Sequence, residues 1–394
     1  MKVLDFEVSL DEIKNGKLEL ADLIKTSLWQ HSPKWLDSLD FEDDTIFLEP
    51  LLFYYFRKLA RQEETVITLD QILFGYTPNG SVNPIFEVYS DPDGIIYLPN
   101  LGCIRTDKSG ISKQNITLNN ENKSALLSGK EFQIQPLNKI KNNEFLLLQN
   151  KPYIYKEIGG YSVEFLESIE DSVNYSEKKI SDLLNKMEKG IPTFFDAVKM
   201  TTREFGIFNS NNFESFAALH HFGTAFLNLA NQKQKPVFFL DDIAHQSGHI
   251  IYYALTHNFQ RFLKPHRDAQ LKDFTKVTYE TRNVYGAFHG LFTYTTILHC
   301  LHVAYQEKWF KGEEGEETLS RIGFYFQKFE YDLRSMGDSR ILTEEGWRYY
   351  DMFQSGFVKI KREYYHLIKD FDYKNQNYNY SFQKFKEVNN FQTV

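Results

Sequence analysis

Two histidines four positions apart, His245 and His249, stand in the segment "DDIAHQSGHI". On a helix this spacing brings both imidazoles to one face, where they can bind the same metal ion. The zinc peptidase motif H-E-x-x-H has the same spacing, and its glutamate removes a proton from metal-bound water. Gln246 stands in place of that glutamate, and a neutral amide accepts no proton near pH 7. The pattern therefore predicts a metal site without the usual hydrolytic base.

A third histidine, His289, lies in the apolar segment "YGAFHGLFTY" between Gly286 and Gly290. Three imidazoles from two helices can hold a divalent transition metal and leave coordination positions open. Glycine within a helix costs about 1 kcal/mol relative to alanine, so the two glycines need a reason. They either let a bulky ligand approach the imidazole or let two helices pack closely. The alternative for the histidines is that they are ordinary core or surface residues.

Acidic residues and another histidine-containing motif stand near this pattern. Asp241 and Asp242 lie four and three residues before His245, where we expect them either to cap the metal helix or to accept a hydrogen bond from a ligating imidazole. The triplet His266-Arg267-Asp268 has the H-x-D form of iron sites with two histidines and one carboxylate. It stands in a polar stretch that is typical of a surface loop, which is the alternative interpretation.

The elements that must position these residues follow from the spacing of apolar side chains. Residues 213–242 predict two or three short strands that end in the apolar run "PVFFL", and the metal helix follows. Residues 281–309 predict a long buried helix that carries His289, and two further helices complete the C-terminal part. Residues 1–62 predict mostly helix, whereas residues 65–160 contain short β-forming runs separated by turn signals.

The sequence therefore predicts an α+β fold. Its C-terminal half is mainly helical and is built around a zincin-like core, in which a strand leads to the metal helix. We predict a mixed helix and strand region over 1–170, which either recognises a substrate or buttresses the core. A helical metal-binding catalytic domain follows over 171–372, and a loosely ordered tail follows over 373–394.

The composition excludes several classes of partner. The chain has 394 residues, a formal net charge of −8 and two cysteines. An acidic chain is a poor match for nucleic acid, whose phosphates require a basic surface. Two distant cysteines form no disulfide framework and suit a reducing cytoplasm. We expect a cytoplasmic protein without nucleic acid or membrane partners, because we find no secretory signal and no apolar run as long as a membrane span.

Three segments together resemble a known family. They are "FAALHHFGTAFLNL", "FFLDDIAHQSGHIIYYAL" and "TRNVYGAFHGLFTYTTIL", and the resemblance covers about residues 213–305. The family consists of peptide-modification proteins with an H-E-x-x-H motif, found near genes for ribosomally made peptides. Some members are hydroxylases that depend on Fe(II) and 2-oxoglutarate and act on β-carbons of peptide residues. An oxygenase can lose the motif glutamate more readily than a hydrolase can.

The resemblance implies roles for individual residues. His245, His249 and His289 match the family's histidines and would hold Fe(II), with open positions for 2-oxoglutarate and O₂. A 2-oxo diacid needs a cation for its distal carboxylate, and a guanidinium offers two parallel donors. Arg282 is the first choice for this cofactor-binding role and Arg267 the second, with a surface ion pair as the alternative for each.

The implied partner is a ribosomally synthesised precursor peptide. The strand predicted at "GTAFLNL" could bind an extended peptide at its edge. We expect His221, Tyr252, Tyr253 and Tyr294 to pack in the core. Two other functions stay open: a zinc-dependent, peptidase-like hydrolase whose base lies elsewhere, and a catalytically degenerate protein that binds peptides.

Overall fold

The structure is a computed structural model of the chain. It describes residues 8–78, 84–107, 109–119, 123–142, 144–148, 157–158, 161–162, 169–210, 213–229, 235–377 and 379–389.

The fold is mixed α+β, as predicted, with a helical C-terminal half and strands in the N-terminal region; 54% of the chain is helical. The chain divides into two compact units. The helical unit comprises Met1–Lys14, Lys178–Met200 and Lys233–Val394, and the sheet unit comprises Asn15–Glu177 and Thr201–Gln232. This division differs from the predicted boundaries near 170 and 372, because the helical unit also takes in N-terminal residues.

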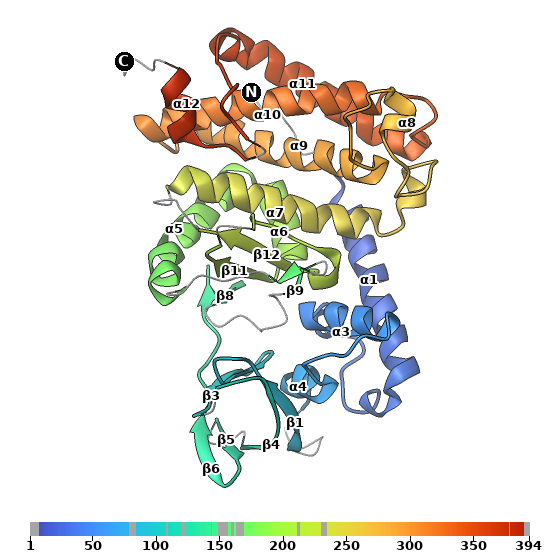
Figure 1. The fold of residues 1–394 in the computed structure, drawn as a ribbon, viewed down its shortest axis with the longest axis vertical. Coiled ribbons are helices and arrows are strands. Elements are labelled where there is room, and N and C mark those ends of the chain that lie inside the picture. The colour runs from blue at the N-terminus through green and yellow to red at the C-terminus, as the bar shows by residue number, and fades with distance from the viewer. Residues whose placement is uncertain are drawn as a thin grey trace. The chain divides into compact units, whose positions relative to one another are not determined.

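The helical unit is built on four long helices that lie side by side (Figure 1). They are α7 (Pro236–Thr256), α9 (Val284–Gln306), α10 (Glu313–Met336) and α11 (Glu344–Ile368). Helices α7 and α9 are buried on nearly every side because their sequences are apolar almost all round, whereas α10 and α11 are amphipathic. The remaining helices of this part are α5 (Ile169–Gly190), α6 (Pro192–Thr201), η5 (Phe259–Arg261), α8 (Lys272–Thr275) and α12 (Phe382–Val388).

Local sequence signals fix where these helices begin. Pro236 occupies the first turn of α7, where its missing N–H and fixed φ suit a helix start. The Asn283 side chain caps α9 by accepting a hydrogen bond from the Gly286 N–H at 2.7 Å. The predicted strand "PVFFL" is wrong, because these residues form the first turns of α7. The predicted long buried helix carrying His289 is confirmed as α9.

The predicted loose tail at 373–394 contains a helix. Residues 378 and 390–394 of it lie outside the described part of the chain. Ser381 caps α12, and Phe385 is fully buried. The Tyr380 hydroxyl pairs with that of Ser320 on α10 at 2.5 Å. The polar composition predicted disorder, but the aromatic residues between the polar ones pack against α10.

The sheet unit contains short strands and the N-terminal helices. One antiparallel sheet has the order β1-β4-β5-β6, and a second has the order β12-β11-β8-β7 with β8, β11 and β12 parallel. The strands are β1 (Ile85–Ser90), β2 (Ile95–Leu98), β3 (Gly102–Arg105), β4 (Ser112–Asn119), β5 (Ser124–Leu127), β6 (Lys130–Gln133), β7 (Lys139–Ile140), β8 (Phe145–Leu148), β9 (Glu157–Ile158), β10 (Tyr161–Ser162), β11 (Glu204–Phe208) and β12 (Thr224–Asn228).

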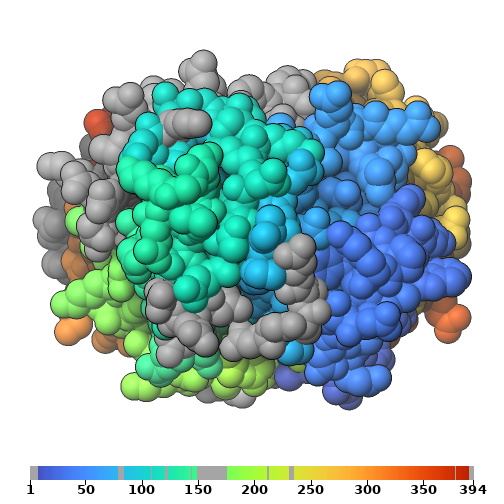
Figure 2. Space-filling view, turned by 90° about the horizontal axis from the view of Figure 1, so that it is seen from below, coloured from blue at the N-terminus to red at the C-terminus, as the bar shows by residue number. Residues whose placement is uncertain are grey.

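One long helix, α1 (Leu10–His31), begins in the helical unit and continues into the sheet unit. The other helices of the sheet unit are shorter: η1 (Pro33–Trp35), α2 (Asp44–Phe47), α3 (Pro50–Ala60), α4 (Leu69–Leu73), η2 (Phe74–Tyr76) and η4 (Leu219–His221). Figure 2 shows a face of this unit on which the N-terminal helical residues, in blue, border the strand residues, in teal. Helix α4 packs against β1, and their contact encloses a small apolar core that includes Phe74, Phe86 and Val88.

Candidate metal centre

The three predicted histidines lie together in the helical unit. His245 and His249 are one turn apart on α7, and their ring centroids are 4.7 Å apart. His289 on α9 approaches His249 with a ring-centroid separation of 4.2 Å, and Nδ1 of His249 faces Nε2 of His289. The packing of α7 against α9 therefore brings together imidazoles that are 40 positions apart in the sequence.

Burial keeps these imidazoles neutral. It lowers the pKa of His245 to about 4 and that of His289 to about 3. Burial also holds the pKa of His249 well below its ordinary value, and the two neighbouring histidines add to this effect. Each ring therefore carries an unprotonated nitrogen at pH 7, which is the form that binds a metal. This set of donors fits a divalent transition metal.

Tyrosines form the wall around His289. The Tyr252 ring stacks on the His289 ring at 4.1 Å with an interplanar angle of 11°. Tyr253 meets the same imidazole edge-on at 5.1 Å. Tyr252 is buried, and so is Tyr294, as predicted for core residues. The stacking fixes the plane of the His289 ring, because any tilt would separate the two faces.

Gln246 is held by its neighbour on the same helix. Its side chain is buried, and its Nε2 donates to Asp242 Oδ1 at 3.1 Å. This bond determines which end of the amide is the acceptor, because the Asp242 carboxylate accepts only from the NH₂ group. Gln246 Oε1 accepts no hydrogen bond from the described residues. At the position of the motif glutamate the protein thus presents a fixed, neutral carbonyl oxygen.

The two aspartates do not cap a helix as predicted. Asp241 and Asp242 lie in the second turn of α7, which begins earlier at Pro236. The buried Asp241 carboxylate accepts hydrogen bonds from Arg321 and, at 3.0 Å, from the Tyr325 hydroxyl, both on α10. Asp241 therefore joins α7 to α10 through a buried ion pair.

Arg282 is occupied by two carboxylates. Its guanidinium donates to both oxygens of Asp332 at 2.9 and 2.7 Å, and to both oxygens of Glu280 at 3.0 and 2.8 Å. The Asp332 side chain is only 2% exposed, so this ion pair is largely shielded from water. A Cβ on Gly290 would lie 2.8 Å from Asp332 Oδ2, so this glycine makes room for the ion pair. Of the two interpretations for Gly290, close packing is the one that the geometry supports.

Arg267 occupies a different environment, beside the tyrosine wall. Its guanidinium lies over the Tyr285 ring at 4.7 Å, and the Tyr285 ring lies 6.1 Å from His289. Its charge opposes the rise that burial causes in the pKa of Tyr253. Its only ion pair with a described residue is with Asp268, at 4.0 Å and exposed to solvent. Its donors are therefore much less engaged than those of Arg282.

The H-x-D motif does not join the three histidines. The side chains of His266 and Asp268 are 71% and 69% exposed, and they contact each other at 3.5 Å. The His266 ring meets Phe259, 5.9 Å away. This segment is therefore an exposed polar loop, which was the alternative interpretation.

Lys328 on α10 was not predicted as part of this region. Burial lowers its pKa to about 8, although Asp241 and Asp332 act in the opposite direction. Its charge in turn adds to the lowering of the pKa of His245, after the larger effect of burial. The sequence carries only a weak signal for it: Tyr325, Lys328 and Asp332 share one face of α10 with Arg321.

Two further predictions concern the sheet unit. His221 is fully buried and stacks on Tyr54 at 5.7 Å, as predicted for a packed residue. The predicted peptide-binding edge at "GTAFLNL" corresponds to β12, which is an edge strand. Phe226 of β12 already exchanges two backbone hydrogen bonds with Phe216, at 3.0 and 2.9 Å. This part of the edge is therefore closed by the chain itself.

Comparison with known proteins identifies no family for this chain. No family model matches the chain, and no curated protein is significantly similar to it. In the described part of the chain, no group of three or more His, Cys, Asp or Glu side chains is already arranged to hold a metal ion. No helix within the described ranges has both the length and the hydropathy of a membrane span.

Proposed function

We propose that this protein is an oxygenase that uses Fe(II) and 2-oxoglutarate to hydroxylate the β-carbon of a residue in a ribosomally synthesised peptide. The observation that carries the proposal is the cluster of three neutral imidazoles, His245, His249 and His289, beside an amide where a hydrolase would have its base. The sequence resemblance to peptide-modification proteins supports the choice of substrate.

His245, His249 and His289 would hold the iron. When bound, Fe(II) supplies the reaction with O₂ that water-activating zinc does not. The protein contributes a buried environment in which the three imidazoles stay neutral and Tyr252 stacks on the His289 ring. The Gln246 carbonyl oxygen can accept a hydrogen bond there but cannot take up a proton.

Arg267 is the better candidate for the distal carboxylate of 2-oxoglutarate. Its guanidinium lies against Tyr285, which contacts His289, and it has one exposed ion pair. Arg282, the first choice from the sequence, donates four hydrogen bonds from its guanidinium to Asp332 and Glu280. Arg282 is therefore a positioning residue, which holds the start of α9 against α10.

A zinc hydrolase with a displaced base is the weaker alternative. Such an enzyme needs a carboxylate or histidine that can take a proton from metal-bound water. The two acids closest in sequence to the histidine pair are committed elsewhere: Asp241 to Arg321 and Tyr325, and Asp242 to Gln246. This observation favours oxygen chemistry over water activation.

Metal content and turnover test the proposal together. The chain is purified without oxygen, loaded with Fe(II) and assayed for metal by mass spectrometry and for succinate formed from 2-oxoglutarate. We expect about one iron per chain and succinate formation, and His289→Ala should lose both. His257→Ala is the matched control, because that histidine lies at the end of α7 and bonds to the Ala254 carbonyl at 3.0 Å.

The substrate is tested with precursor peptides encoded by neighbouring genes, and the product should gain one oxygen atom on a β-carbon. Iron binding without succinate or oxidised peptide would exclude the oxygenase. Stoichiometric zinc with peptide cleavage in the absence of O₂ would establish the hydrolase. Binding of a peptide without any bound metal would indicate a degenerate binding protein.

A further inference from the structure

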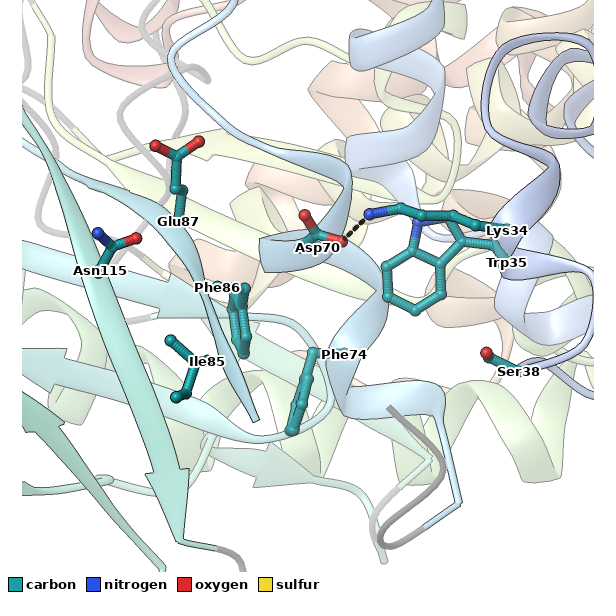
Figure 3. Close-up of a pocket in the computed structure, with 9 residues that line it drawn as sticks. All are labelled: Lys34, Trp35, Ser38, Asp70, Phe74, Ile85, Phe86, Glu87 and Asn115. Atoms are coloured by element: carbon teal, nitrogen blue, oxygen red, sulfur yellow. Dashed lines mark hydrogen bonds and ion pairs between the residues drawn. The ribbon is translucent and has the colours of Figure 1, made fainter. Parts of the chain in front are cut away.

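The sheet unit contains a pocket that the metal centre does not involve. It has a volume of about 420 Å³ and lies between the N-terminal helical segment and strand β1 (Figure 3). Residues of η1, α4 and η2 form one side, and residues of β1 and β4 form the other. Its volume is within the range of ligand pockets, at the size that accommodates one large side chain with adjoining backbone.

Aromatic side chains line the interior of this pocket. Phe74 and Phe86 stack on each other at 4.7 Å with an interplanar angle of 24°, and both are buried. Figure 3 shows the ring of Trp35, itself only 3% exposed, across the space from this pair. At the rim, Ile85 is 55% exposed, which is unusual for an isoleucine next to such a wall. These surfaces favour a bulky apolar group between the rings.

The charges at the rim cancel one another. Lys34 pairs with Asp70 at 2.9 Å, and Lys113 pairs with Glu87 at 2.7 Å. Each pair is at least partly exposed, so neither adds a strong field. A charged ligand would gain little here and would lose its hydration. The complementary ligand is therefore uncharged where it enters the pocket.

The pocket also follows the edge of a sheet. Strand β1 pairs only with β4 in its sheet. The Pro84 carbonyl accepts a hydrogen bond from the Leu118 N–H on the β4 side. Hydrogen-bonding directions alternate along a strand, so the backbone groups of Glu87 and Tyr89 point away from β4.

On the side away from β4, α4 and its capping residue Thr68 satisfy three backbone groups. Thr68 donates to the Glu87 carbonyl, and Gln71 bonds to both the N–H and the carbonyl of Tyr89. Among the described residues, no group accepts from the Glu87 N–H. Because Glu87 also lines the pocket, its N–H is a backbone donor that a carbonyl of a bound peptide can use.

We propose that this pocket binds an extended peptide. The peptide inserts one bulky, uncharged apolar side chain between Trp35 and the Phe74–Phe86 pair, and one of its backbone carbonyls accepts a hydrogen bond from the Glu87 N–H. The proposal does not depend on the metal centre or on its reaction. It would make the sheet unit a peptide-recognition module in its own right.

Fluorine NMR of the full chain tests the proposal. The four tryptophans are replaced by 5-fluorotryptophan, and the Trp35 signal is assigned by its loss in Trp35→Phe. The probes are capped pentapeptides with glycine at four positions and Phe, Leu, Ala, Lys or Glu in the centre. We expect the Phe and Leu peptides to shift the Trp35 signal saturably. The Ala, Lys and Glu peptides should bind at least about tenfold more weakly, because they bury less apolar surface or carry a charge.

Two variants locate the binding. Ile85→Glu places a charge at the rim and should abolish the shift, whereas Leu126→Glu should leave it unchanged. Leu126 is the matched control because it is 46% exposed and lies on β5 of the same sheet.

Three outcomes would overturn the proposal. One is the absence of a saturable shift with any peptide at millimolar concentration, and another is an unchanged shift in Ile85→Glu. The third is binding of free indole as tight as that of the Phe peptide, since that would assign the pocket to small aromatic molecules instead.

Discussion

At the scale of single residues, the two arginines show that the position of a residue in the sequence does not reveal whether its side chain is already bound to a carboxylate. From the sequence, Arg282 is the first choice for the cation that binds 2-oxoglutarate and Arg267 is the second. The difference between them arises from Asp332, which is 50 positions beyond Arg282 and occupies its guanidinium. The histidine cluster was more predictable, because helical spacing fixes His245 and His249, and small residues mark His289. Gln246 could also be interpreted directly, since its chemistry depends on residue type alone.

We predict that substitution of Arg267 affects binding of 2-oxoglutarate, whereas substitution of Arg282 affects the stability of the fold. Arg267→Gln should weaken binding of 2-oxoglutarate by about tenfold or more, because a charge-assisted hydrogen bond is lost, and should leave the free energy of unfolding unchanged. Arg282→Gln should lower the free energy of unfolding by about 3 kcal/mol, because it leaves the buried Asp332 carboxylate without its partner. Calorimetric titration and urea denaturation measure the two effects. A stable Arg282→Gln protein that no longer binds 2-oxoglutarate would reverse the assignment.

At the scale of elements, Gly248 shows how closely α7 and α9 pack against each other. A Cβ on Gly248 of α7 would lie 2.5 Å from Thr296 Oγ1 of α9. That hydroxyl lies within hydrogen-bond distance of two carbonyls, Ala244 of α7 at 3.0 Å and Thr293 of α9 at 2.8 Å, so moving it away would break its contact with α7. The close approach of α7 and α9 is what brings His249 and His289 into contact.

Gly248→Ala is therefore expected to destabilise the helical unit by about 1–3 kcal/mol through overpacking and to weaken metal binding with it. Gly315→Ala is the control, because its Cβ would lie no closer than 3.4 Å to the nearest atom and alanine is the better helix former. It should raise the free energy of unfolding by up to about 1 kcal/mol. Urea titrations of both variants measure the difference. Equal free energies of unfolding for the two variants would contradict this prediction, because they would show that the Thr296 side chain can move aside without destabilising the fold.

The elements themselves could be predicted to different degrees. Helix α9 follows from its length and apolar character, and the turn signals correctly indicated short strands between positions 85 and 148. The start of α7 could not be placed, because five consecutive apolar residues fit a buried helix as well as a buried strand. The aromatic contacts that order α12 are made with α10, so no local pattern reveals them.

At the scale of the whole molecule, buried neutral histidines occur in both units. Burial lowers the pKa of His220 in the sheet unit, and of His245 and His302 in the helical unit, to about 4. Their ordinary pKa is 6.5, so the unfolded chain binds more protons than the folded chain between pH 6.5 and about 4. Stability is therefore complete above pH 6.5 and is lost as the pH falls through this window.

Acid should thus weaken the folded state from pH 6.5 downward, because these histidines take up protons more readily in the unfolded chain. We expect the free energy of unfolding to fall between pH 6.5 and 5, with each buried histidine contributing up to about 1.4 kcal/mol per pH unit. His302→Gln should reduce the slope, because burial lowers the pKa of that histidine. Urea denaturation at a series of pH values measures the slope. A stability that is constant over this range would contradict neutral burial of these residues.

The helical unit is assembled from segments that are far apart in the sequence. Glu12 accepts hydrogen bonds from Arg348 and Tyr349 on α11, across 336 and 337 positions. A ribosome adds residue 12 long before residue 348, so this unit cannot close until the residues of α11 have been made. The residues of the sheet unit have all been added by position 232, so this unit can fold while synthesis continues. A ribosome that stalls after residue 232 would thus carry the complete set of residues for one unit and only a fragment of the other.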